Sequence, residues 1–302
     1  MNRRQQSPSF WGCVIRAIGI AMTLLSLNPE RGENCALAAE RSHAATLGTV
    51  ALQIEASTWK QRGHIIYDIE GSIRKKLINA GFKVLRDAVA PYDHLLTVTY
   101  RETRGAEYAF NAFGTVITCR FQFLIHPSQP MMDFQVMETS TNSVSGTPPY
   151  LDAVHRFETN PYYFFLGDIL AGSVLKSLNL REALLWAVER HLSAFRQIQD
   201  PDDRALERSE HYMMSSQEFY RPFAIRRTIQ LFIEANDPAM VPLWQALIHD
   251  PDPMVRIQAI EMVEAFHVVD ARAELAKLAA EDVNPQVRDR AGNVMTSLDH
   301  GR

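Results

Sequence analysis

The order of hydrophobic and polar positions along the chain alternates between two periods. From Val50 to about Ser140 the period switches between two and 3.6 residues, which is typical of a domain that combines a sheet with helices. The strongest strand pattern lies at 115–125, where every second residue is apolar and would face one side of a sheet. The apolar positions are Ile117, Cys119, Phe121, Phe123 and Ile125, and Thr118, Arg120 and Gln122 lie between them.

A helical pattern precedes these strands. Apolar residues recur at helical spacing from Ile65 to Leu77, and Gly81 stands where a helix C-cap is expected. The order of one strand, one helix and then several consecutive strands predicts an α+β fold, an antiparallel sheet with a helix packed on one face. The apolar residues of the helix are Ile65, Ile66, Ile69, Ile73 and Leu77.

The sequence after this domain changes in composition. Residues 139–149 are rich in Ser, Thr, Asn, Gly and Pro, which predicts a loop or linker. Six aromatic residues follow between Tyr150 and Phe165, and they form either an exposed contact patch or the packing between the sheet and later helices. We favour packing. Helical patterns then cover 165–178 and 181–198, and the second carries an apolar stripe at Leu184, Leu185, Val188, Leu192, Phe195 and Ile198.

The last part of the chain contains internal repeats. The stretch that begins at Asp250 parallels the stretch that begins at Asp282, with an offset of 32 residues. Four identities carry the match, because Pro253, Val255, Arg256 and Ala259 recur as Pro285, Val287, Arg288 and Ala291. A more divergent earlier copy aligns Ile225, Arg226 and Ile229 with Val255, Arg256 and Ala259 at an offset of 30 residues.

The motif Asp-x-Pro-x-Val-Arg-x-x-Ala at Asp250–Ala259 resembles the signature of HEAT repeats in their short bacterial form. The resemblance implies an all-α solenoid that follows the α+β domain. It also implies that Arg256 and Arg288 join neighbouring repeats instead of binding a ligand. The prolines Pro253 and Pro285 fit the first turn of a helix, where a missing N–H is tolerated.

The N-terminus has the pattern of an export signal. Arg3 and Arg4 precede an apolar stretch at 10–27 in which Arg16 is the only charged residue. The uninterrupted apolar part at 17–27 is short for a membrane span, so we favour a cleaved signal over an uncleaved anchor. We divide the chain into a signal peptide and leader (1–44), an α+β domain (45–140), a linker or packing loop (141–163), a helical connector or cap (164–216) and HEAT-like repeats (217–302).

Composition and cysteines narrow the choice of function. The net charge of -4 provides no general attraction for nucleic acid. Cys13 and Cys35 lie within the expected leader, which leaves Cys119 as a buried structural thiol. The front domain loosely resembles small periplasmic α/β modules of outer-membrane assembly lipoproteins, although it lacks their lipid-attachment cysteine.

The sequence contains no phosphate-binding glycine loop, no paired-cysteine metal motif, no His-Glu-x-x-His and no Gly-x-Ser-x-Gly motif. Asp152, His155 and Glu158 are spaced by three and could share one helical face as metal ligands or an acid/base group, but such spacing is common by chance. We therefore expect no catalytic residue, no cofactor and no metal. The alternative is a HEAT-like lyase, similar to those that attach bilin pigments, or another enzyme whose site is unrecognised.

The sequence thus favours an exported, non-catalytic scaffold or adaptor of the periplasm or cell envelope. Its partner would be another protein, bound by the repeats, and a peripheral association with the envelope membrane stays open. The expected binding face lies on the first helices of the repeats and includes Arg227, Gln230, Gln258 and Glu261.

Overall fold

The computed structural model describes most of the chain after the expected leader. The described residues are 47–59, 67–85, 91–109, 112–125, 130–141, 148–176, 179–197 and 216–300. Contacts unite Leu47–Arg302 into one compact unit. The expected signal peptide at 1–44, with Cys13 and Cys35, lies outside the described residues.

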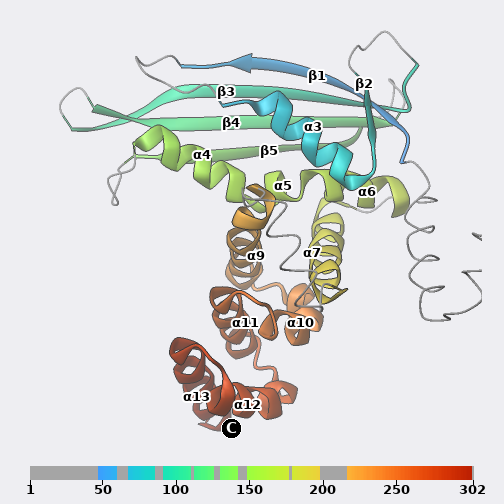
Figure 1. The fold of residues 1–302 in the computed structure, drawn as a ribbon. Helices are drawn as coiled ribbons and strands as arrows, with labels where there is room; N and C mark the ends of the chain where they lie inside the picture. Colours follow the sequence, from blue (N-terminus) through green and yellow to red (C-terminus); the bar gives the residue numbers. More distant parts are fainter. Residues whose placement is uncertain are drawn as a thin grey trace, which may run out of the picture. The chain divides into compact units, whose positions relative to one another are not determined.

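Five strands form one sheet in the order β2-β1-β3-β4-β5 (Figure 1). The run β3-β4-β5 is antiparallel, which confirms the α+β prediction, whereas β1 pairs in parallel with both β2 and β3. The sheet is therefore mixed. The helix between β1 and β2 carries the chain back to the end of the sheet at which β1 began, so β2 runs in the same direction as β1. The strands are β1 (Thr49–Ser57), β2 (Lys83–Leu85), β3 (His94–Ala109), β4 (Ala112–Ile125) and β5 (Pro130–Ser140).

The predicted front helix is α3 (Ile69–Ala80). Ile69, Ile73 and Leu77 are buried on its inner side, as their spacing predicts. Asp68 caps the helix by accepting a hydrogen bond from the Gly71 N–H at 2.9 Å. Gly81 ends it with φ 104°, in the left-handed region that favours glycine, which confirms the predicted C-cap. Ile65 and Ile66 of the predicted stripe lie outside the described residues.

Alternation along β4 separates a buried face from a polar face. Its residues Ile117, Cys119, Phe121 and Phe123 are fully buried, which confirms the strand pattern. Burial raises the pKa of the Cys119 thiol far above its usual value, so this cysteine stays a structural thiol at neutral pH.

Three helices that follow the sheet lie with α3 along the same face of the sheet (Figure 1). They are α4 (Pro149–Thr159), α5 (Pro161–Phe164) and α6 (Leu166–Lys176), so the later part of the expected linker is packed helix. Packing of the aromatic stretch is confirmed. Tyr163 is fully buried and stacks on Phe121 of β4 at 6.0 Å between ring centroids.

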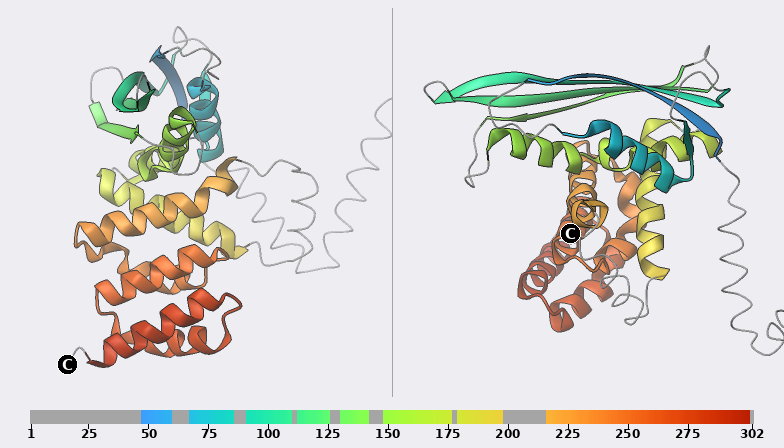
Figure 2. Two further views of the ribbon diagram at one scale, coloured as in Figure 1. Left: turned by 90° about the vertical axis from the view of Figure 1, so that its left-hand side faces the viewer. Right: turned by 45° about the horizontal axis from the view of Figure 1, so that its top comes forward.

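The remaining helices stack in layers next to these (Figure 2). In α7 (Leu180–Gln197) the predicted stripe residues Leu184, Val188 and Leu192 are buried. No helix of the described residues is long and apolar enough to cross a membrane. The later elements are α9 (Ser216–Glu234), η1 (Pro238–Leu243), α10 (Trp244–Ile248), α11 (Pro253–Ala265), η2 (Val269–Ala271), α12 (Arg272–Glu281) and α13 (Pro285–His300).

Candidate functional site

Two helices of the repeats begin with the same cap. At α11, Asp252 accepts hydrogen bonds from the N–H groups of Met254 (2.8 Å) and Val255 (3.2 Å), and Pro253 occupies the first turn. At α13, Asn284 accepts a hydrogen bond from the Gln286 N–H at 2.9 Å. The side-chain cap supplies an acceptor for N–H groups that have no partner within the helix, and proline has no N–H to satisfy. The repeated motif therefore specifies where each helix starts.

Arg256 joins two successive repeats. Its guanidinium donates to both carboxylate oxygens of Asp282 at 2.9 Å and to the Asp250 carbonyl at 2.8 Å. Its side chain is 14% exposed and that of Asp282 is 6% exposed. Arg288 donates to the Asp282 carbonyl at 2.6 Å. Arg256 therefore joins two repeats, as the resemblance implied, whereas Arg288 donates to carbonyls of the loop that precedes its own helix.

The first repeat follows a different register from the one that the sequence suggested. Asn236 and His267, which follow α9 and α11, share the rare left-handed conformation with φ 50° and 51°, and they lie 31 residues apart. Burial repeats at the same interval, because Ala224 and Thr228 match Val255 and Ala259. The offset of 30 residues is therefore wrong by one.

This correction changes which arginine supports the first repeat. In the observed register Arg256 corresponds to Ile225, so Arg226 does not take the inter-repeat position. Arg221 supports the first repeat instead. It lies on α9 directly before Pro222, and its guanidinium donates two hydrogen bonds to the Asp250 carboxylate, at 2.7 and 3.2 Å. The pair is almost fully buried, with side chains 3% and 1% exposed.

The four residues of the predicted face fall into two equivalent rows. Arg227 and Gln258 lie 31 residues apart, as do Gln230 and Glu261, so each pair occupies one position on successive first helices. Gln258 donates to Glu261 at 2.6 Å along α11, and Arg290 of α13 lies 3.9 Å from Glu261. These side chains lie at matching positions along the first helices of successive repeats. We call the surface formed by Arg227, Gln230, Gln258 and Glu261 the polar strip.

Arg227 has a different environment from the other three. It donates to Glu138 of β5 at 2.7 Å and to the Arg156 carbonyl of α4 at 2.8 Å. The Glu138 side chain is 9% exposed and also accepts a hydrogen bond from Asn160 at 2.7 Å. Arg227 therefore attaches the first repeat helix to the sheet and to α4, while Gln230, Gln258 and Glu261 form the rest of the strip.

Residues 223–296 match the family model for HEAT repeats. The C-terminal quarter of this chain is a HEAT-repeat array. No curated protein matches the chain. HEAT repeats stack into solenoids whose extended surfaces commonly bind other proteins, so the array is typical of an interaction scaffold. On α13 the apolar residues Val287, Ala291, Val294 and Leu298 are all buried.

The acidic and histidine residues of α4 do not converge on one site. Asp152 pairs with Arg156 at 2.9 Å, and His155 packs against Phe223 of α9 at 5.2 Å between ring centroids. Glu158 points to the other side and accepts a hydrogen bond from Tyr67. Across the described parts of the chain, no group of His, Cys, Asp or Glu residues could hold a metal ion.

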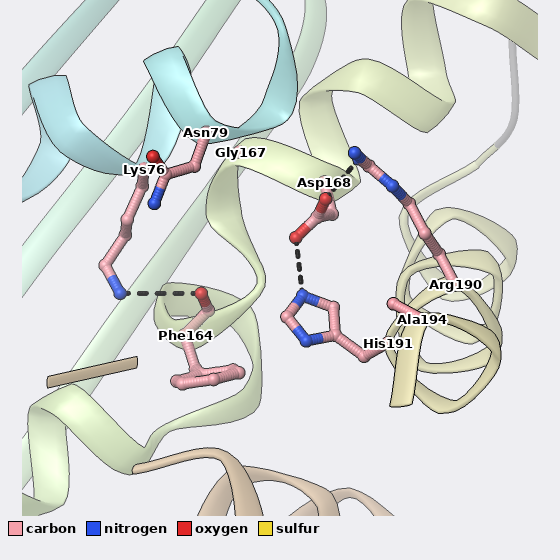
Figure 3. Close-up of a pocket in the computed structure, with 8 residues that line it drawn as sticks. All are labelled: Lys76, Asn79, Phe164, Gly167, Asp168, Arg190, His191 and Ala194. Carbon is pink, nitrogen blue, oxygen red and sulfur yellow. Dashed lines mark hydrogen bonds and ion pairs between the residues drawn. The ribbon is translucent and has the colours of Figure 1, made fainter. Parts of the chain in front are cut away.

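A small cavity lies outside the HEAT repeats, between α3, the start of α6 and α7 (Figure 3). Its volume is about 160 Å³. Asp168 stands in its wall and accepts hydrogen bonds from Arg190 and from His191 Nε2, the latter at 2.9 Å. The cavity is lined by Lys76, Asn79, Phe164, Gly167, Asp168, Arg190, His191 and Ala194.

Sequence reasoning missed this cavity. Its charged residues come from three helices that are far apart in the sequence, so no short spacing links Lys76, Asp168 and Arg190. Only the adjacent pair Arg190 and His191 stands close together, on an otherwise ordinary amphipathic helix. A contact between α3 and α6 brings the rest together, and Gly167 allows it: a Cβ there would lie 2.3 Å from the Lys76 carbonyl oxygen.

Proposed function

We propose that this protein is an exported scaffold or adaptor of the cell envelope, which binds a partner protein through the polar strip of its HEAT repeats and catalyses no reaction. The observation that carries the proposal is the repeated strip itself. Gln230 and Glu261 lie at equivalent positions of α9 and α11, and Gln258 lies one turn from Glu261 on α11, so a partner surface could contact all three at once.

The internal use of arginine supports this choice of face. Arg221, Arg256 and Arg288 lie at the inter-repeat loops, where they bind carboxylates and carbonyls of the chain itself. These contacts fix the helices relative to each other, so the strip is ordered before a partner arrives. An ordered surface loses less entropy on binding, which favours affinity.

The front domain supports a scaffold role by holding the array. Arg227 ties α9 to Glu138 of the sheet, and His155 of α4 packs on the aromatic residues of α9. We infer that the sheet domain sets the orientation of the repeats. A second partner at the sheet would then be placed at a fixed distance from the first.

The proposal of export and envelope location rests on the N-terminal sequence. Arg3, Arg4 and the apolar stretch at 10–27 have the order of a secretory signal. Fractionation of cells that express the full chain tests this point. We expect a shortened protein in the periplasmic or envelope fraction, and full-length protein confined to the cytosol would contradict it.

Charged substitutions test the binding face. Gln230→Arg and Gln258→Arg together add two positive charges to the strip, and neither glutamine is buried. We expect this variant to lose the partner that wild-type protein captures after crosslinking in the native envelope fraction. The matched control is Gln245→Arg, an exposed glutamine on α10, which lies on a second helix of the array. Equal capture by both variants and wild type would refute the proposed face.

A further inference from the structure

The cavity beside α7 combines a confined volume with an unbalanced set of charges. It is separate from the HEAT repeats, so ligand binding there does not depend on the proposed scaffold function. The wall groups that carry charge are Lys76 from α3, Asp168 from α6 and Arg190 from α7, with His191 next to them. They surround a volume of about 160 Å³ (Figure 3).

The carboxylate in the wall is already matched. Asp168 Oδ1 accepts from Arg190, and Oδ2 is 2.9 Å from His191 Nε2. The Asp168 side chain is 13% exposed, so this fixed geometry is largely shielded from water. One positive and one negative charge therefore cancel on this side of the cavity.

The opposite wall holds Lys76, and among the described residues that line the cavity only Asp168, already bound to Arg190, carries a carboxylate. Lys76 Nζ donates to the Phe164 carbonyl at 3.4 Å and lies 4.6 Å from the centre of the Tyr163 ring. The carboxyl group nearest to it in ion-pair range is Glu158, at 3.7 Å. Burial raises the pKa of Glu158 to about 8, so this carboxyl group is largely protonated at neutral pH.

The pKa of Lys76 shows how strongly burial disfavours its charged form. Burial lowers it to about 7, against a partial attraction from Asp168, and the neighbouring Lys75 lowers it further. The Lys76 side chain is only 16% exposed. An added anion within the cavity would stabilise the charged form of this amine, because opposite charges interact strongly where water is excluded.

We propose that this cavity binds a small organic carboxylate, whose charged group pairs with Lys76. The Phe164 ring and Ala194 supply apolar surface for the rest of the molecule. The volume is close to that of an engineered protein cavity that holds benzene, so the enclosed part of this pocket has room for about six to nine non-hydrogen atoms. Arg190, at the exposed side with 43% of its side chain accessible, is placed to attract the anion on entry.

Binding is then coupled to protonation of Lys76. With a pKa of about 7, the charged fraction of this amine falls about tenfold between pH 6 and pH 8. Glu158, which faces the amine at 3.7 Å, acts in the same direction, because this carboxyl group gains negative charge as the pH rises. The apparent affinity for a carboxylate should therefore be about tenfold weaker at pH 8 than at pH 6.

Calorimetric titration of the full chain with propionate, succinate and benzoate at both pH values tests this proposal. Benzamide, which has the shape of benzoate without its charge, is the matched ligand control. We expect saturable binding of at least one acid with a Kd between micromolar and millimolar, roughly, and none of benzamide. Failure of all three acids to bind, or equal binding of benzoate and benzamide, would overturn the proposal.

Two variants locate any binding that is found. Lys76→Met removes the amine and keeps an unbranched apolar chain, and Ala194→Phe places a ring at the cavity wall. Each should weaken binding at least tenfold, whereas Ser193→Phe, at the exposed neighbouring position on α7, should not. Binding that survives both Lys76→Met and Ala194→Phe would place the carboxylate elsewhere and refute the assignment.

Discussion

The buried ion pair between Arg221 and Asp250 offers a direct test of the corrected repeat register. Its two side chains are 3% and 1% exposed, and two hydrogen bonds join them. Replacing Arg221 by Met preserves much of the apolar stem but removes the guanidinium that is bound to the buried Asp250 carboxylate. Asp250 would keep the hydrogen bond from the Asp252 N–H at 3.0 Å, which cannot neutralise its charge.

The expected cost follows from this burial. Removing one partner of a buried ion pair costs about 3–5 kcal/mol, because an uncompensated charge remains in a site without water. An exposed pair of similar geometry contributes much less, because water screens its charges. The chain contains such a pair in Arg181 and Asp237, joined at 2.6 and 2.7 Å, with side chains 50% and 23% exposed.

Thermal unfolding of the full chain, followed by circular dichroism, compares the two variants. Arg221→Met should lower the midpoint by roughly 6–20 °C, at about 2–4 °C per kcal/mol, while Arg181→Met should lower it much less. The double variant Arg221→Met/Asp250→Leu should regain most of the loss, since no unpaired charge is left. Equal effects of the two single variants would show that Arg221 is not buried in the first repeat.

Three further changes test other parts of the structure. Gly167→Ala should destabilise the protein by about 1–3 kcal/mol, because its Cβ would meet the Lys76 carbonyl. Gly292→Ala in α13 should instead stabilise the protein by about 0.5–1 kcal/mol, since a Cβ at this position meets nothing within 4 Å. Urea unfolding measures both changes in the free energy of unfolding. In the wild-type protein the raised pKa of Glu158 makes the free energy of unfolding fall as the pH rises from about 4.5 to 8. Glu158→Gln should therefore make the free energy of unfolding depend less on pH in this range. An unchanged pH dependence would contradict burial of this carboxyl group. Arg227→Met should speed hydrogen exchange in β5 and α4, while Gln230→Met should leave it unchanged.

The elements with local signals were predictable from the sequence. Alternation in β4 determined its buried face, and the spacing of Ile69, Ile73 and Leu77 with Gly81 determined α3 and its end. The repeat motif specified the caps of α11 and α13, since Pro253 and Pro285 fit the first turn of a helix, where a missing N–H costs no hydrogen bond. Each of these features depends on residues within one element.

The features that depend on distant residues could not be predicted. The parallel pairing of β1 with β3 requires knowing where the loop after β2 returns, and the sequence of β1 suits either direction. The predicted register of the first repeat was wrong because Arg226 falls on the motif arginine at an offset of 30 residues. The arginine that binds Asp250 is Arg221, five positions earlier. The cavity likewise exists only because Gly167 lets α6 approach α3.

Photo-crosslinking from defined positions tests the central proposal most directly. A benzophenone amino acid at Gln258 would lie on the polar strip, and one at Ala276 would lie on the exposed side of α12. We expect one partner protein to be crosslinked in the native envelope from Gln258 and not from Ala276, and lost when Gln230→Arg is added. Crosslinking of that partner from Ala276 alone, or from neither position, would contradict binding through the first helices of the HEAT repeats.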